Sequence, residues 1–159
     1  VMARLAPEFD WGAVWTSGLK LSEAARFGTA GLPSDWLSVH DPAPVPAAQF
    51  TPDFGYNAIR IPLYLMRAGF SDPRWLAPYS QAWHSGAQTG IPLINVKTDQ
   101  IVARLAEPGY RMLAATLDCV TEKTPLPEDL KLFRPTHYYP SALYLLSLSF
   151  LTERHAECL

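Results

Sequence analysis

The chain has 159 residues, a formal charge of −2 and an apolar share of 48%, and these values describe one folded domain with a real core rather than a disordered chain. It has neither a basic stripe that could neutralise phosphates nor an apolar window of membrane-spanning length, so we expect no nucleic-acid or membrane partner. Cys119 and Cys158 are too few for a disulfide framework, and no Cys/His group has zinc-ligand spacing, so we expect no metal and no other cofactor.

Helical periodicity alternates along the chain with connections rich in proline and glycine, which predicts an all-α fold. The first helix is predicted over residues 17–27, with Gly28 as its C-terminal stop. Residues 31–55 contain too many prolines and glycines for regular structure, so we expect a long loop there. Loops of this length inside a compact domain are often functional, and this one is the first place to look for a site.

Residues 57–68 are apolar nearly all the way round, which predicts a helix buried on several sides. Its regular part should begin near Pro62, because proline fits the first turn of a helix but not its interior. Asp72 and Pro73 then match an N-cap followed by proline at the first helical position, so we expect another helix to begin there.

The second half of the chain contains two further predicted helices, over residues 110–120 and 140–154, while residues 92–101 could be extended. The helix over 140–154 has little polar face. Helices that are apolar on more than one side need neighbours on more than one side, and this short chain offers few. The pattern is the first sign that a partner half is missing.

Residues 54–65 read F-G-Y-N-A-I-R-I-P-L-Y-L. This segment resembles the signature of family 8 glycoside hydrolases, the bacterial endoglucanases, in which Tyr-Asp-Ala is followed two places later by Arg. Residues 25–36, 89–115 and 138–146 are similar to later parts of the same family, in the same order. The resemblance is to the C-terminal portion of the family's catalytic domain, covers nearly all of residues 1–159, and implies part of an (α/α)6 barrel with a substrate groove across one end.

The resemblance further implies a function: endo-acting hydrolysis of β-1,4-glucan by inversion, with a cellulose-type oligosaccharide or polysaccharide as the partner. The general-acid Glu of the family lies in an N-terminal motif that these residues lack, which again suggests a missing N-terminal half. Residues 1–7 carry no signal peptide, so the chain taken alone reads as cytoplasmic. By resemblance, the parent protein is expected to be secreted or periplasmic.

Inversion requires two carboxyl groups roughly 6.5–9.5 Å apart, one as acid and one as base. The family's base commonly occupies the position of Asn57, yet a carboxamide has no usable basicity near neutral pH. Three explanations remain open. A neighbouring carboxylate, Asp53, Asp35 or Asp41, could act as the base; Asn57 could be an engineered inactivation; or the lineage could have become a glycan binder.

The resemblance places Tyr56, Asn57 and Arg60 at the cleavage point, with Trp36 as a stacking residue and Asp35 as a further substrate contact. Each has a structural alternative: Arg60 could form a buried salt bridge, and Tyr56 could be a core aromatic residue. Two rival functions also stand beside the enzyme. One is a non-catalytic glucan-binding or degenerate family member, and the other is an unrelated helical interaction domain.

Overall fold

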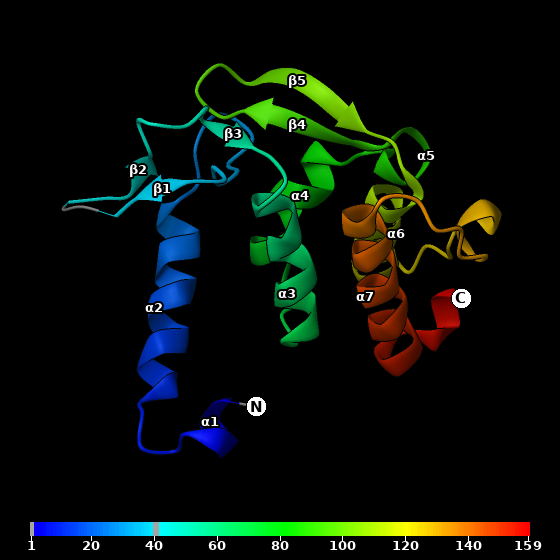
Figure 1. Cartoon of the computed structure of the whole chain (residues 1–159), viewed down its shortest axis with the longest axis horizontal. Helices are drawn as coiled ribbons and strands as arrows, with labels where there is room; N and C mark the ends of the chain where they lie inside the picture. Colours follow the sequence, from blue (N-terminus) through cyan, green and yellow to red (C-terminus); the bar gives the residue numbers. More distant parts are fainter. Residues whose placement is uncertain (1, 40–41) are drawn as a thin grey trace.

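The computed structural model describes residues 2–39 and 42–159. Most of the described residues are helical (Figure 1). The helices are α1 (Met2–Leu5), α2 (Trp11–Ala24), α3 (Ile61–Arg67), α4 (Pro73–Ala82), α5 (Gly86–Thr89), α6 (Pro108–Glu122) and α7 (Tyr138–Arg154), with 3-10 turns η1 (Ala58–Arg60), η2 (Glu128–Leu130) and η3 (Ala156–Cys158). The strands are β1 (Leu37–Ser38), β2 (Val45–Pro46), β3 (Asp53–Phe54), β4 (Ile91–Asn95) and β5 (Gln100–Leu105).

The prediction of an all-α fold is wrong in one respect, because the chain also forms two small antiparallel sheets. One pairs β1 with β2, and the other has the order β3-β4-β5. Residues 31–55, expected to lack regular structure, contain three of these short strands. The extended segment expected over residues 92–101 contains most of β4 and the start of β5. Neither strand alternates with period two, because β4 is buried at four consecutive residues and β5 is exposed at five.

The predicted helices are confirmed, with shifted ends. The helix expected over 17–27 is α2, which begins at an N-cap, Asp10, whose side chain accepts a hydrogen bond from the Ala13 N–H. It ends at Ala24 with Ala25 as its C-cap, so the prediction of Gly28 as its stop is wrong. Pro62 lies in the first turn of α3, and the residues before it form η1. Asp72 caps α4, its side chain accepting the Arg74 N–H at 2.9 Å. These starts follow local rules of capping and proline placement, which act within a few residues.

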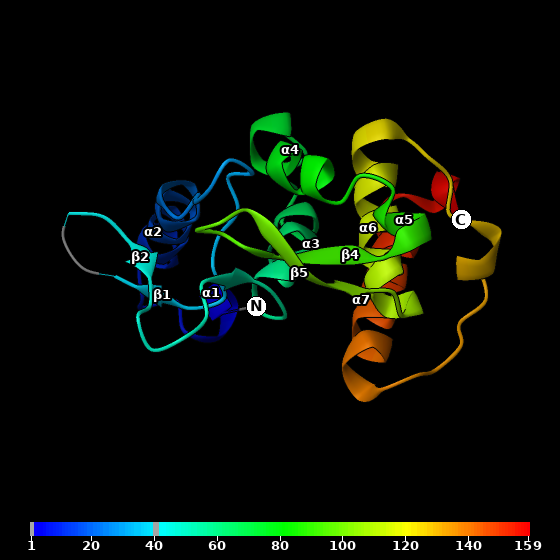
Figure 2. The same ribbon diagram turned by 90° about the horizontal axis from the view of Figure 1, so that it is seen from above.

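The three-stranded sheet lies across one end of helices α2, α3 and α7, which extend away from it (Figure 1). Seen from above, α3 lies between α2 on one side and α6 with α7 on the other (Figure 2). The core is formed mainly by α3, α4, α6, α7 and the buried side of β4. None of the helices in the described part of the chain is both long and apolar enough to span a membrane.

Helix α2 contributes no buried residue to this core, although all its residues are described. A cavity of about 300 Å³ separates it from α3, lined mostly by apolar side chains that include Trp15, Leu19 and Leu65. On α7, Leu145 and Leu146 are also exposed. Exposed apolar surface on neighbouring helices is typical of an interface that a further part of a protein covers.

A disulfide joins Cys119 of α6 to Cys158 of η3, and both cysteines are buried. The same end of the chain is held by a hydrogen bond from the Leu126 N–H to the Cys158 carbonyl, at 2.8 Å. The cysteines were too few to predict a framework, but one pair is enough to close a loop. The disulfide therefore fixes the C-terminal turn against α6.

We expect replacement of both cysteines by alanine to lower the free energy of unfolding by roughly 3–4 kcal/mol. The disulfide joins residues that are 39 apart in the sequence, and it therefore reduces the conformational entropy of the unfolded chain. Urea unfolding followed by circular dichroism measures the difference. Dithiothreitol should destabilise the unsubstituted chain and leave the double variant unchanged. Equal urea midpoints for the two proteins without reductant would contradict a stabilising disulfide.

Candidate functional site

The turn that precedes α3 is held by the carboxylate of Asp35. One oxygen, Oδ1, accepts hydrogen bonds from the N–H groups of Gly55 at 3.0 Å, Asn57 at 3.0 Å and Ala58 at 2.8 Å. The backbone of Asp35 is fixed in turn, since its N–H donates to the carbonyl of Asp53 at 2.8 Å. A carboxylate that accepts several backbone N–H groups makes strong, charge-assisted hydrogen bonds. The turn over residues 55–58 is therefore rigidly placed.

Gly55 is required for this arrangement. A Cβ at that position would lie 2.6 Å from Oδ2 of Asp35, closer than side-chain carbons approach oxygen. Glycine has no Cβ, so the backbone can come this near to the carboxylate. Gly55 and Asp35 thus form one unit, although 20 residues separate them.

Asn57 and Arg60 contact one another directly on this turn. The guanidinium of Arg60 donates to Oδ1 of Asn57 at 3.1 Å and to the Asn57 carbonyl at 3.3 Å. Within the described residues Arg60 forms no salt bridge, so the structural alternative of a buried ion pair is not found. Asn57 itself is exposed, and the amide nitrogen of its side chain remains available to donate to a ligand.

Tyr56 lies next to two other tyrosines, Tyr110 and Tyr139, and the three ring centroids are 6.1–6.3 Å apart. The hydroxyl of Tyr139 donates a hydrogen bond to the carbonyl of Tyr56. Burial raises the pKa of Tyr139 to about 12, with Arg60 nearby acting in the opposite direction. The phenol therefore keeps its proton at neutral pH and remains a donor. Tyr56 is half exposed rather than a core residue.

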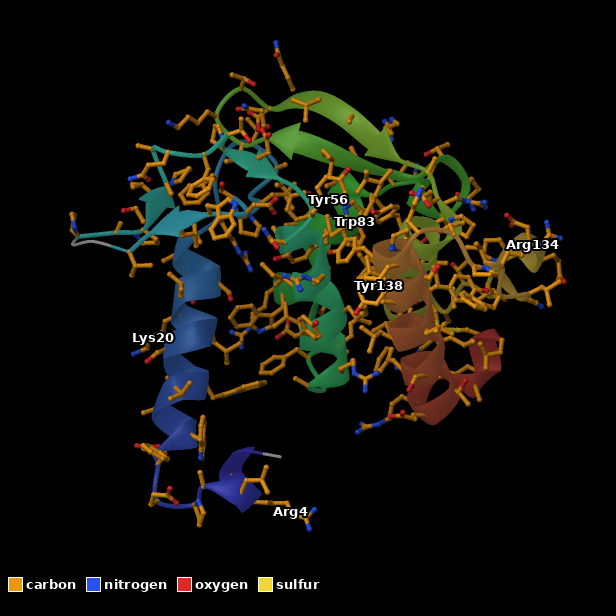
Figure 3. The ribbon with its side chains drawn as sticks, in the orientation of Figure 1. Arg4, Lys20, Tyr56, Trp83, Arg134 and Tyr138 are labelled. Carbon is orange, nitrogen blue, oxygen red and sulfur yellow. A yellow bond between two sulfur atoms is a disulfide. The ribbon has the colours of Figure 1, made fainter. Side chains whose placement is uncertain are left out.

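Exposed aromatic rings occur next in sequence to the two residues that hold this turn, Asp35 and Tyr139. Tyr138, the first residue of α7, is 89% exposed and lies at the same end of the helices as Tyr56 (Figure 3). Trp36 is half exposed and stacks on Phe50, with ring centroids 4.6 Å apart. Because Trp36 follows Asp35 directly, the Trp36–Phe50 pair is connected to the anchored turn. Flat exposed rings of this kind can stack on the apolar faces of sugars.

The neighbouring carboxylates differ in their availability. Asp35 is used as the anchor of the turn. Asp53 lies in β3, half buried, and its Oδ1 has no hydrogen-bond partner among the described residues. Asp41 lies outside the described residues. In the described part of the chain no group of three or more His, Cys, Asp or Glu side chains could hold a metal ion.

A cavity of about 270 Å³ lies behind the turn, between the C-terminal part of α2 and the start of α3. Asp35 and Asn57 line it together with Ser34, whose buried hydroxyl has no partner within the described residues. Apart from Ser22, the other residues that line it are apolar. The turn therefore has one face towards this cavity.

The structure thus brings together Asp35, Tyr56, Asn57 and Arg60, as the sequence suggested, and it gives Asp35 an anchoring contact that the sequence did not indicate. The tyrosines at 110, 138 and 139 were missed as site residues. Their only sequence signal was that 138–146 and 89–115 belong to the segments that resemble the family.

A family model and several known proteins match most of this chain. The family model described as glycosyl hydrolases family 8 matches residues 4–152. A probable endoglucanase of Novacetimonas hansenii is 34% identical over 92% of this chain, which covers 44% of that protein. An endoglucanase of Cellulomonas uda is 33% identical over 57% of this chain.

Solved structures give the same result. The endo-beta-1,4-glucanase CMCax from Acetobacter xylinum superimposes with a TM-score of 0.78 at 32% identity, over 95% of this chain and 47% of that one. The endoglucanase from Komagataeibacter sucrofermentans superimposes with a TM-score of 0.77, also at 32% identity, over 97% of this chain and 47% of that one. This chain therefore spans about half the length of the relatives that it matches. With a family match over most of its residues, the chain belongs to family 8 of the glycosyl hydrolases.

Proposed function

We propose that this chain is the C-terminal portion of a family 8 catalytic domain, forms part of an (α/α)6 barrel, and belongs to an endo-1,4-β-glucanase that hydrolyses cellulose-type glucan by inversion. In this proposal the groove passes over the 55–60 turn. Tyr56, Asn57 and Arg60 contact the sugar at the cleavage point, and Trp36 stacks on a neighbouring unit.

One observation carries the proposal: the anchored turn at the start of α3 presents the half-exposed ring of Tyr56 and the side chain of Asn57 outward, with the Arg60 guanidinium bonded to the Asn57 amide oxygen. This combination of flat apolar rings with amide and guanidinium donors suits a β-linked glucan, whose rings have apolar faces and hydroxyl edges. The similarity to an endo-beta-1,4-glucanase and to a probable endoglucanase also supports it.

A second candidate is a non-catalytic glucan binder, and the residue at position 57 favours it. The carboxamide of Asn57 cannot take a proton from water near neutral pH, and its Oδ1 already accepts a hydrogen bond from Arg60. Such a protein would hold glucan in the groove without cleaving it.

The test combines binding and cleavage by the purified chain. Cellohexaose is titrated in a calorimeter, and reducing ends released from carboxymethylcellulose are measured in parallel. We expect binding without release, because no general acid is identified in this chain and position 57 lacks a base. Release by the unsubstituted chain would mean that another carboxylate is the base and that the acid lies among these residues. Absence of binding by the folded chain would contradict the proposed groove.

Replacing Tyr56 by alanine should weaken cellohexaose binding about 30-fold, the typical effect of removing an aromatic residue at the centre of a binding surface. Trp15→Ala is the matched control. Trp15 is also an aromatic residue with 49% of its surface exposed, as in Tyr56, but it lies on α2 against Phe70. Loss of affinity in the Trp15 variant with none in the Tyr56 variant would place the sugar elsewhere.

A further inference from the structure

We infer that Asp35 and Tyr139 are positioning residues that hold the 55–58 turn from opposite sides, so that the orientation of Asn57 is set before any ligand binds. The inference deepens the proposed function, and its binding measurement rests on that function. A second measurement, on the turn itself, does not.

The first N–H groups of η1 are capped by a residue distant in the sequence. Asn57 occupies the N-cap position of η1, yet its side chain makes no capping hydrogen bond. The first N–H groups of a helix need acceptors, and the residue at the N-cap usually supplies one. Here Asp35 accepts the N–H groups of Asn57 and Ala58 from 22 and 23 residues away. A remote carboxylate has taken over the capping role, and the side chain of Asn57 is free for Arg60 and for a ligand.

The other side of the turn is held by α7. The hydroxyl group of Tyr139, near the start of α7, donates a hydrogen bond to the carbonyl oxygen of Tyr56. That carbonyl belongs to the peptide bond whose N–H, on Asn57, donates to Asp35. The same peptide group is therefore held at its oxygen by α7 and at its nitrogen by the residues before β1. Rotation of this peptide would break both hydrogen bonds.

Together these contacts give Asp35 a role different from that of a base. Its Oδ1 already accepts three N–H groups, and its Oδ2 lies against Gly55. The Asp35 carboxylate is therefore occupied by the backbone of the 55–58 turn. Asp35 therefore acts on the site through the orientation of Asn57.

Tyr139→Phe tests one side of the turn, since it removes only the hydroxyl. Tyr144→Phe is its matched control: Tyr144 lies on the same helix and also donates to a backbone carbonyl, that of Leu130. We expect Tyr139→Phe to weaken cellohexaose binding roughly tenfold, the typical effect of one lost hydrogen bond. Tyr144→Phe should leave the affinity unchanged even where it lowers the melting temperature.

Asp35→Ala tests the other side, with hydrogen exchange of the backbone N–H groups of Gly55, Asn57 and Ala58 as the readout. These three should exchange at least about tenfold faster in the variant, because local opening no longer breaks hydrogen bonds to the carboxylate. Asp35→Asn, which keeps an acceptor oxygen, should restore part of the protection. The control Asp99→Asn removes the charge of a carboxylate that accepts one N–H, from Thr29 at 2.9 Å, and should leave the turn unaffected.

The two readouts separate the possible failures. If the unsubstituted chain does not bind cellohexaose, the proposed function fails, while the exchange rates still test the positioning role. If exchange at Gly55, Asn57 and Ala58 is the same in Asp35→Ala, Asp35→Asn and the unsubstituted chain, the anchor is refuted. If Tyr139→Phe and Tyr144→Phe lost cellohexaose affinity equally, Tyr139 would contribute only to overall stability. That result would overturn the positioning role of Tyr139.

Discussion

Replacing Asn57 by aspartate is expected to produce glucan hydrolysis only when a general acid is also present. The suitable protein is a chimera in which the N-terminal part of the Novacetimonas hansenii relative precedes this chain. With Asn57 the chimera should release few reducing ends from carboxymethylcellulose. With aspartate at that position, release should rise roughly 10²–10⁴-fold, the usual contribution of a positioned base. The isolated chain should remain inactive with either residue.

The physical basis is the anchored turn. A carboxylate at position 57 would replace the amide oxygen that accepts from Arg60 at 3.1 Å, and the backbone that carries it is fixed by Asp35. The new group would therefore lie at position 57, where the resemblance to the family implies a base, without rearrangement of the turn. Asn95→Asp is the matched control, since Asn95 is the chain's other asparagine and its Oδ1 accepts N–H groups of the β4–β5 turn.

Two results would change this account. An active chimera that still carries Asn57 would show that another carboxylate is the base, and Asp53→Asn would then be the next variant to assay. A folded chimera that stays inactive with aspartate at position 57 would favour the glucan binder. Neither result depends on whether the isolated chain binds glucan.

The elements that could be predicted from sequence are those fixed by near neighbours in the chain. Asp72 caps α4 and Pro62 lies in the first turn of α3 because capping and proline geometry act within a few residues. The 57–68 segment was recognised as buried because apolar residues surround the helix. Strands β4 and β5 were recognised only as one extended segment over residues 92–101, because each is nearly uniform in burial and gives no alternation.

The candidate site likewise has residues that could be predicted from the sequence and contacts that could not. Tyr56, Asn57 and Arg60 lie within five residues and were identified together from one signature. The contacts that hold them come from Asp35 and Tyr139, which are 22 and 83 residues distant from their partners. A hydrogen bond over such a separation leaves no periodic pattern in the sequence, so only the folded structure reveals it.

Gly109→Ala should be the most destabilising substitution of a glycine in the chain, lowering the free energy of unfolding by roughly 3 kcal/mol or more. Gly109 is the second residue of α6, and a Cβ there would overlap the carbonyl oxygen, carbonyl carbon and Cα of Pro140 in α7. Backbone atoms of a helix cannot rotate aside as a flexible side chain would. The two helices would have to separate, and urea unfolding measures the cost.

The same substitution should also impair the candidate site, because the residues next to this contact are Tyr110 and Tyr139, whose rings pack together. Displacement of α7 would draw the Tyr139 hydroxyl away from the Tyr56 carbonyl. Gly18→Ala is the control: a Cβ there meets no atom within 4 Å, and alanine inside a helix should stabilise the chain by roughly 0.5–1 kcal/mol. If Gly109→Ala were as stable as Gly18→Ala, the close approach of α6 and α7 would not hold in solution, and the anchoring of the 55–58 turn by α7 would fail with it.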